Sequence, residues 1–309
     1  MGRVASMMLV VALLGGTAAA FAVTEGLKLE KSPILSTQVA KIFSPVCNCD
    51  KDIAAIRFRL REPDTIRVEI LRGEDVIRTL VAGRRVGKGS VHLTWNGRDD
   101  SGFVVREGTY QPRVHLDARH RTILLPNAIR VDLTPPRVKK VAASPTEISP
   151  DGDGRRDRVT LRYELSERAH AILLVDGQRA VYTRGQLPRS SVIWNGRLDG
   201  KPLPPGVHVL RLAAQDTAGN SSSEGGPIRV RIRYIELARS SIRVKTGTRF
   251  GVRVTTDASG FSWRLAARSG TAKPGLLVLR APDKPGRLRL VVEERGHTAA
   301  ATVVVERRT

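Results

Sequence analysis

The chain has 309 residues, and its 52 Lys and Arg residues against 30 Asp and Glu residues give a formal net charge of +22. Because 41% of the residues are hydrophobic, the chain can bury ordinary cores, which excludes a disordered basic tail. Two cysteines are too few for a scaffold built from disulfides, while 28 glycines and 17 prolines predict many turns. The length favours two or three domains.

The chain begins with an apolar segment. Residues 4–23 carry no charge and follow Arg3. A helix of this length can cross a hydrocarbon core of about 30 Å. We therefore predict that residues 1–30 form a single membrane anchor that holds the rest of the protein outside the cytoplasm. Small residues ending at Ala20 or Ala22 leave a cleaved signal peptide, and hence a secreted protein, as the alternative.

The sequence also contains an internal repeat. Residues 44–60 align without a gap on residues 149–165, at an offset of 105. Both copies then carry Trp-Asn-Gly-Arg, at residues 95–98 and 194–197. Two homologous units of about 100 residues are therefore predicted.

Each unit shows the alternation that is typical of strands. Ile56, Phe58 and Leu60 alternate with arginines in the first unit, and Leu161 and Tyr163 alternate with polar residues in the second. No helical pattern separates these runs, so βαβ units are not expected. The predicted fold class is all-β, with tandem Ig-like antiparallel β-sandwiches behind an N-terminal apolar helix.

Two prolines at residues 135 and 136 separate the units, because each removes a backbone donor that a continuing sheet would need. We predict a first Ig-like repeat at 31–134, a second at 135–233 and a divergent β-sandwich at 234–309. The last segment lacks the Trp-Asn-Gly motif. Its strand-like runs are residues 241–255, 276–279, 288–292 and 298–305.

The Trp-Asn-Gly motifs predict structural turns. Asn-Gly is the preferred pair for a tight turn with both central residues at positive φ, and the tryptophan would anchor the strand that enters it. A ligand-binding loop is the alternative interpretation. The residues concerned are Trp95, Asn96 and Gly97 in the first unit and Trp194, Asn195 and Gly196 in the second.

Taken together, these motifs resemble the Ig-like domain of the flagellar hook-capping protein FlgD. The shared pattern is Ser-Pro with acidic and glycine residues, a strand ending aromatic-x-Leu, Trp-Asn-Gly-Arg, and Gly-x-Tyr at residues 108–110. It covers residues 34–233, with His208 in the second unit where the first has Tyr110. Residues 216–220, Asp-Thr-Ala-Gly-Asn, also resemble the end of a bacterial Ig-like repeat. The resemblance implies Ig-like repeats of a secreted bacterial protein.

A glycine-rich loop in the second unit is a candidate metal site. Asp151, Asp153 and Asp157 have a spacing that lets oxygens wrap a hard cation such as Ca²⁺. Arg155 and Arg162 stand where an EF-hand would have oxygen ligands, so other oxygens would have to complete the shell. The alternative is an Asp-Gly turn whose aspartates accept hydrogen bonds from backbone amides. Both hypotheses remain open at this point.

In the first unit the same loop carries both cysteines of the chain. At the offset of 105, Cys47 and Cys49 align with Gly152 and Gly154. A disulfide that closes the turn is one hypothesis, and an exported location permits it. The alternatives are an intermolecular bridge and a two-thiolate metal site.

Catalytic motifs are missing from the sequence. It has no Gly-x-Ser-x-Gly and no His-Glu-x-x-His, and its six histidines are scattered. We predict that the protein is not an enzyme. Its leading function is that of an extracytoplasmic, membrane-tethered structural or binding protein of the bacterial envelope. The alternatives are a flagellar hook-capping scaffold, for which no hook-binding region is recognised, and accessory binding domains for a cell-wall enzyme.

The positive charge indicates the kind of partner. Arginines at solvent-facing positions, such as 229, 231 and 233, attract anionic wall or membrane polymers, and salt weakens that attraction. A charged face that only confers solubility is the alternative. Nucleic acid is not expected in vivo, because an exported protein rarely meets it and no aromatic stacking platform is present. The expected partner is a cell-envelope protein or such an anionic polymer.

Overall fold

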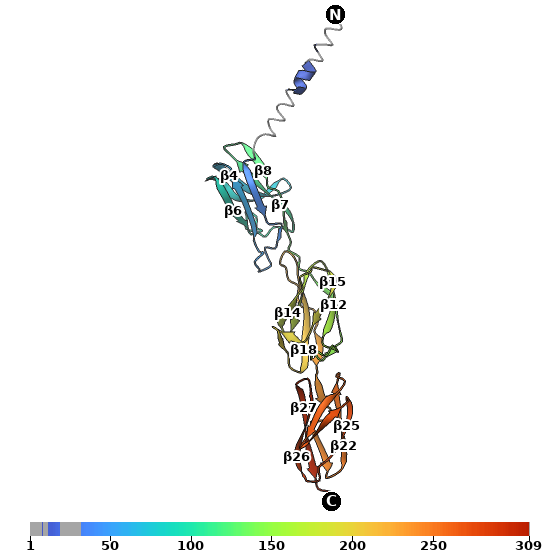
Figure 1. Ribbon diagram of the computed structural model, residues 1–309. Coiled ribbons are helices and arrows are strands. Elements are labelled where there is room, and N and C mark those ends of the chain that lie inside the picture. The colour runs from blue at the N-terminus through green and yellow to red at the C-terminus, as the bar shows by residue number, and fades with distance from the viewer. Residues whose placement is uncertain (1–7, 9–11, 19–31, 309) are drawn as a thin grey trace. The chain divides into compact units, whose positions relative to one another are not determined.

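The computed structural model describes residues 8, 12–18 and 32–308, and almost all of this part of the chain forms strands and turns (Figure 1). It confirms the predicted all-β class of tandem Ig-like sandwiches. The chain divides into two compact units, Met1–Leu133 and Thr134–Thr309. The first unit holds one hydrophobic core, and the second unit holds two. The boundaries proposed for three domains stay a prediction.

Only a small part of the N-terminal segment is described. Residues 12–18 are helical, and Leu13 and Leu14 there are exposed. Among the described residues, no helix has both the length and the apolarity that a membrane span requires. Most of the predicted anchor, residues 1–30, lies outside the described residues, so the anchor stays a prediction.

The first sandwich packs a three-stranded sheet, in the order β1-β3-β6, against a sheet in the order β2-β9-β7-β4-β5 with β8 beside β7. Its strands are β1 (Ile34–Val39), β2 (Ile42–Phe43), β3 (Ala54–Leu60), β4 (Asp64–Arg72), β5 (Asp75–Val86), β6 (Gly89–Trp95), β7 (Gly108–Leu116), β8 (Arg121–Leu124) and β9 (Ile129–Val131). In β3 the alternating Ile56, Phe58 and Leu60 are buried, as predicted. Burial of this apolar face stabilises the two sheets against each other.

The second sandwich repeats this topology, with sheets in the orders β10-β12-β15 and β11-β19-β18-β13-β14 and a short β16-β17 ribbon. Its strands are β10 (Val138–Ser144), β11 (Glu147–Ile148), β12 (Val159–Leu165), β13 (His170–Val175), β14 (Gln178–Tyr182), β15 (Arg189–Trp194), β16 (Arg197–Leu198), β17 (Lys201–Pro202), β18 (Gly206–Gln215) and β19 (Ile228–Ile232). Leu161 and Tyr163 face its core.

The third sandwich has the same strand order, β20-β22-β25 and β21-β27-β26-β23-β24. Its strands are β20 (Ile235–Leu237), β21 (Ser241–Lys245), β22 (Arg249–Thr256), β23 (Phe261–Leu265), β24 (Arg268–Ala272), β25 (Gly275–Arg280), β26 (Gly286–Glu294) and β27 (His297–Glu306). The predicted single run 241–255 is two strands, because a turn with Gly247 at φ +66° separates them.

The pairing differs from the prediction in one respect, since each sandwich contains one parallel pair. These pairs are β2 with β9, β11 with β19, and β21 with β27. In each sandwich the chain first runs along the three-stranded sheet and then crosses to the edge of the larger sheet. There it lies beside the last strand and runs in the same direction.

Candidate metal centre

The two Trp-Asn-Gly turns have the same geometry. Trp95 Nε1 donates to the carbonyl oxygen of Arg98 at 2.9 Å, and Trp194 Nε1 donates to that of Arg197 at 2.8 Å. Both indole rings are almost fully buried. The turns are therefore fixed to the core by their tryptophans, as a structural role requires.

The backbone of these turns departs from the prediction. Gly97 and Gly196 have φ of +68° and +72°, but Asn96 and Asn195 are not at positive φ, so the expected turn with two such residues is wrong. Packing explains only why glycine stands at these positions. A Cβ atom on Gly97 would lie 2.7 Å from the Pro45 ring, so the glycine allows a close approach between turn and proline.

One further residue in each unit, already noted in the shared sequence pattern, bonds to a nearby backbone carbonyl. Tyr110 Oη donates to the carbonyl oxygen of Arg106 at 2.7 Å, and His208 Nε2 lies 2.9 Å from that of Pro204. His208 Nδ1 lies 2.7 Å from Asp176 Oδ2. This His-Asp pair resembles part of a catalytic triad, but the nitrogen that would act as base already contacts a backbone carbonyl. The pair is structural.

In the first unit, Cys47 and Cys49 are joined by a disulfide, with their Cα atoms 5.3 Å apart. The bridge spans one residue, Asn48, which adopts φ +54°. Ser44 N donates to the carbonyl oxygen of Lys51 at 3.1 Å and closes the loop from its other side. Both sulfur atoms are engaged, so neither is free for a metal or a partner chain.

In the second unit, Asp151, Asp153 and Asp157 lie together. Each offers a carboxylate oxygen, and these oxygens lie within 4.8 Å of one another. All three residues lie in the loop that joins β11 to β12, and all three are partly buried. An all-oxygen group of this size suits a hard cation rather than zinc or copper.

The same aspartates hold the backbone of the loop. Asp157 accepts from Gly152 N and Gly154 N, each at 2.8 Å. Asp151 Oδ1 accepts from Asp153 N at 3.0 Å. These are the bonds expected of an Asp-Gly turn, but each carboxylate oxygen has two lone pairs and can also face a cation. The metal site on this loop stays a prediction.

Two acidic residues of the third sandwich escaped the sequence analysis. Asp257 lies in the turn between β22 and β23, and Glu294 ends β26. Glu294 is only 6% exposed. A signal for it exists, because Leu290, Val292 and Glu294 occupy successive inward-facing positions of one strand. An acid in that series indicates a special environment.

A basic groove lies on the three-stranded sheet of the second sandwich. It has a volume of about 900 Å³, and Lys140, Arg162 and Arg189 line it together with Glu164. Lys140 and Arg189 flank Glu164 as cross-strand neighbours. The hydrogen bond from Arg189, and then the charges of the nearby cations, lower the pKa of Glu164. The groove therefore carries net positive charge.

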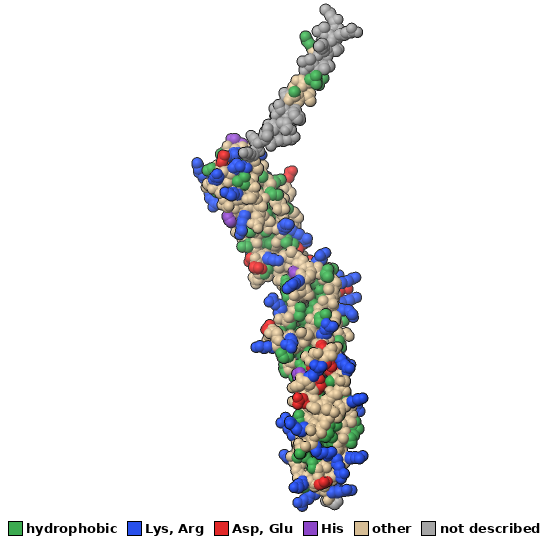
Figure 2. All heavy atoms as spheres, in the orientation of Figure 1, with side chains coloured by type: hydrophobic (Ala, Val, Ile, Leu, Met, Phe, Trp, Pro, Cys, Tyr) green, Lys and Arg blue, Asp and Glu red, His purple; other side chains and the backbone are tan. Residues whose placement is uncertain are grey.

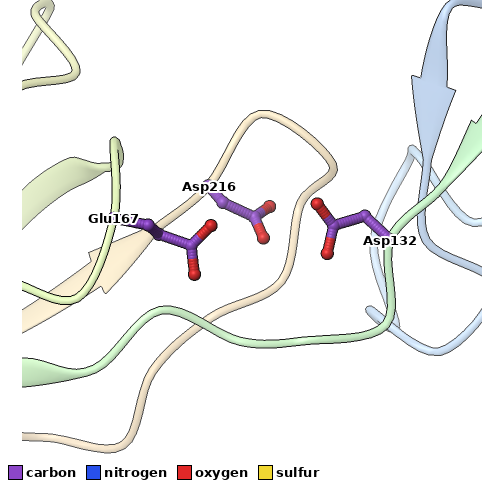
Figure 3. A group of neighbouring side chains, drawn as sticks. All are labelled: Asp132, Glu167 and Asp216. Carbon is purple, nitrogen blue, oxygen red and sulfur yellow. The ribbon is translucent and has the colours of Figure 1, made fainter. Parts of the chain in front are cut away.

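A second acidic pair in the second unit contains Asp216, which has a structural role. Oxygens of Glu167 and Asp216 lie within 4.8 Å (Figure 3), and Asp216 is buried. Asp216 Oδ1 accepts from Asn220 N, and its Oδ2 accepts from Asn220 Nδ2, each at 2.9 Å. These bonds close the Asp-Thr-Ala-Gly-Asn loop and explain why that motif ends a strand. Asp132, also drawn in Figure 3, belongs to the first unit.

Solved structures of tandem modules are similar to this chain. The fibronectin(III)-like modules of Clostridium thermocellum CbhA are 14% identical, with a TM-score of 0.38, over 64% of this chain and 94% of theirs. A tandem from titin is 13% identical, with a TM-score of 0.31, over 89% and 99%. A bacterial ice-binding adhesin of 1.5 MDa is 11% identical, with a TM-score of 0.30, over 90% and 100%.

No family model and no curated protein matches the chain. The structural similarities are too low to inform function, which has to come from the chain's own residues.

Proposed function

We propose that the protein is a non-enzymatic structural and binding protein of the bacterial envelope, and that its Ig-like sandwiches present basic surfaces to an anionic polymer. The observation that carries this proposal is the groove on β10, β12 and β15. Lys139, Lys140, Arg162 and Arg189 line it, against one acid, Glu164. Figure 2 shows further Lys and Arg side chains projecting from the visible face of the sandwiches. A polymer of repeated negative charges fits such a surface better than a single small anion does.

The location of the body outside the cytoplasm is part of the same proposal. Two features support it, the apolar run at residues 4–23 and the bond between Cys47 and Cys49. Disulfides persist in oxidising compartments and are rare in the cytosol. Membrane fractionation of the full chain distinguishes an uncleaved anchor, which stays in the membrane fraction, from a secreted form.

The test of polymer binding uses the full chain and poly(glycerol phosphate), with binding measured at low and high salt. Each basic residue near an anionic surface contributes about 1 kcal/mol, so the double variant Lys140→Gln, Arg162→Gln should bind about 30-fold more weakly. The matched control is Arg287→Gln, Arg289→Gln, which removes the same charge from exposed positions of β26. The control should weaken binding much less.

Equal losses in the two double variants would show that net charge alone attracts the polymer, and would remove the groove from the proposal. Absence of binding by the wild-type chain at low salt would remove the polymer altogether. A protein of the envelope would then be the partner to seek.

The FlgD-type identity is a finer proposal, supported by the same turn geometry in both repeats. It implies either a hook-capping scaffold or a secreted protein unrelated to flagella. Deletion of the gene distinguishes them, because a hook-capping scaffold is required for motility. Accessory domains of a cell-wall enzyme would instead raise peptidoglycan turnover by a neighbouring hydrolase.

A further inference from the structure

The third sandwich exposes an apolar edge strand. β25 is the outermost strand of the sheet β20-β22-β25, and among the described strands it pairs with β22 alone (Figure 1). Its side chains alternate, so that Leu277 and Leu279 enter the core while Leu276 and Val278 remain 65% and 55% exposed. The pairing with β22 keeps one register along the whole of β25, so this edge is regular. A regular apolar edge is a template for pairing with another strand.

The corresponding strands of the other two sandwiches are better protected. β6 and β15 occupy the same outer place in the sheets β1-β3-β6 and β10-β12-β15. Their exposed positions are mostly polar, namely Ser90, His92 and Thr94 in β6, and Arg189, Ser191 and Ile193 in β15. Polar and charged side chains at an edge discourage pairing with another chain. The pair of branched apolar side chains on β25 is therefore a difference between otherwise equivalent strands.

The backbone of β25 is oriented for the same pairing. Ala281 N donates to the carbonyl oxygen of Thr248 at 2.8 Å, and these two residues continue the β22–β25 register. Positions that bond to the neighbouring strand alternate in an antiparallel pair, so the N–H and C=O groups of Leu276, Val278 and Arg280 point away from β22. The carbonyl oxygen of Arg280 agrees with this, because it accepts from an arginine side chain of β24 at 3.2 Å. Leu276 and Val278 thus direct main-chain groups outward beside their exposed side chains.

Arginines flank the exposed apolar pair. Arg249 and Arg253 of β22 and Arg280 of β25 are exposed on the same face of the sheet. Arg253 lies opposite Leu276, and Arg249 lies opposite Arg280. A second copy of this chain would bring the same cations and its own net charge of +22, so it is disfavoured as the occupant of this edge. An acidic residue close to the apolar ones in a partner strand would complement these charges.

We propose that β25 binds an extended segment of a partner protein by strand addition, and that this segment has the pattern acidic-x-apolar-x-apolar. In an antiparallel pairing, which continues the pattern of the sheet, the acidic residue lies opposite Arg280 and the two apolar residues lie opposite Val278 and Leu276. Main-chain hydrogen bonds supply the affinity, and alternate side chains supply the specificity. This site is separate from the basic groove, which lies on the second sandwich.

The probe is a fluorescent peptide with blocked ends, Thr-Glu-Thr-Val-Thr-Val-Thr, and its binding to the full chain is measured by anisotropy. We expect saturable binding at or below millimolar concentration. N-methylation of both valines removes two N–H groups that face β25 and should weaken binding about tenfold or more. N-methylation of the two inner threonines is the matched control, because their N–H groups point away from β25 and the affinity should change little.

Variants of the chain test the same edge from the other side. Val278→Lys replaces an outward apolar side chain by a charged one and should weaken peptide binding about tenfold or more. The matched control is Ile193→Lys, the same kind of change at an exposed position of the equivalent strand β15, and its affinity should stay close to the wild-type value. Arg280→Gln should weaken binding by about fivefold or less, and high salt should reduce that difference. The replaced side chains are exposed, so each variant should keep a Tm close to that of the wild type.

Four results would overturn the proposal. One is absence of peptide binding to the wild type at millimolar concentration. Another is equal binding of the two N-methylated peptides, which would exclude main-chain pairing. The third is an equal loss of affinity in Val278→Lys and Ile193→Lys, which would reduce the effect to overall charge. The fourth is self-association of the wild type, seen by sedimentation and abolished by Val278→Lys, which would make a second copy the occupant of the edge.

Discussion

The same loop follows the first sheet crossing in both repeats, and its two copies are held in different ways. The first copy is closed by the bond between Cys47 and Cys49. The second has glycines at those positions and is held by hydrogen bonds to Asp151, Asp153 and Asp157. The backbone frame is shared, because Ser44 N and Ser149 N each donate to the carbonyl oxygen of the residue seven positions later.

One position inside this loop shows what the difference entails. Ser149 Oγ donates to Asp151 Oδ2 at 3.3 Å. At the offset of 105, Val46 replaces Asp151 in the first copy, and the buried Ser44 Oγ has no hydrogen-bond partner among the described residues. The backbone hydrogen bond that closes the loop is thus the same in both copies, while the side chain facing the serine hydroxyl differs. A carboxylate loop can bind a cation and face a neighbouring sandwich, whereas a disulfide loop is closed on itself.

The largest loss of stability is expected in the Trp-Asn-Gly turns, which the two repeats share. Gly97→Ala and Gly196→Ala would each force a Cβ atom to within 2.7 Å of a proline ring, at positive φ. A left-handed residue costs about 1–2 kcal/mol, and the rigid contact adds about as much. We expect each variant to lower the unfolding free energy of its own sandwich by roughly 3 kcal/mol. Urea unfolding followed by tryptophan fluorescence measures it, because each sandwich contains one tryptophan.

The control for both variants is Gly102→Ala. Gly102 has φ +86°, but nothing lies within 4 Å of its added Cβ, so only the backbone term remains. A loss in Gly97→Ala no greater than that of the control would show that contact with the proline does not require glycine there. Very different losses of unfolding free energy in Gly97→Ala and Gly196→Ala would show that the two turns are not equivalent.

A smaller effect, a change in hydrogen exchange, should distinguish the disulfide loop of the first repeat from the aspartate loop of the second. The disulfide closes a loop of three residues, and so short a loop gains at most about 1.5 kcal/mol from the restriction of the unfolded chain. Reduction should therefore raise hydrogen exchange about tenfold in residues 42–56 and leave residues 147–161 unchanged. Removal of Ca²⁺ by EDTA should do the converse, because the sequence predicts a Ca²⁺ site at Asp151, Asp153 and Asp157.

The double variant Cys47→Ser, Cys49→Ser is the control for the reductant, which should have no further effect on it. A rise in exchange in both loops under either treatment would contradict the comparison. It would mean that the treatment loosens the whole chain rather than the loop that carries the bond.

The fold was predictable where alternation and repetition were strong. Ile56, Phe58 and Leu60 gave a buried face, and the two copies supported each other. In the third sandwich, β24 (Arg268–Ala272) was missed because it contains almost no apolar side chains and is positioned by pairing with β23. The parallel edge pairs were missed for a different reason, because they join segments far apart in the sequence.

The candidate site was predictable only in its local half. Spacing alone brought Asp151, Asp153 and Asp157 together, because neighbouring residues of a loop stay close. Asp257 reaches that loop only through the packing of one sandwich on another, where its carbonyl oxygen accepts from Arg155 Nη1, and no local pattern encodes that contact. The inward position of Glu294 in β26 indicated an unusual acid, but it could not indicate which residues the acid faces.

The smallest expected effect is the change in unfolding free energy on replacing Ser44 or Ser149 by alanine, and the two changes should have opposite signs. Ser149→Ala loses a hydrogen bond to a carboxylate and should destabilise its sandwich by about 1 kcal/mol. Ser44→Ala removes a buried hydroxyl group that has no partner, so it should stabilise the first sandwich by about as much. Urea midpoints of the two variants against the wild type give both signs.

A double-mutant cycle then tests the cause of that difference. Val46→Asp places a carboxylate where the second repeat has Asp151, and Val46 is exposed enough to accept the charge. In that background the Ser44 hydroxyl gains an acceptor, and Ser44→Ala should become destabilising. If Ser44→Ala kept the same sign in both backgrounds, the carboxylate would not be what Ser44 lacks. The two loops would then differ in backbone position rather than in a single side chain.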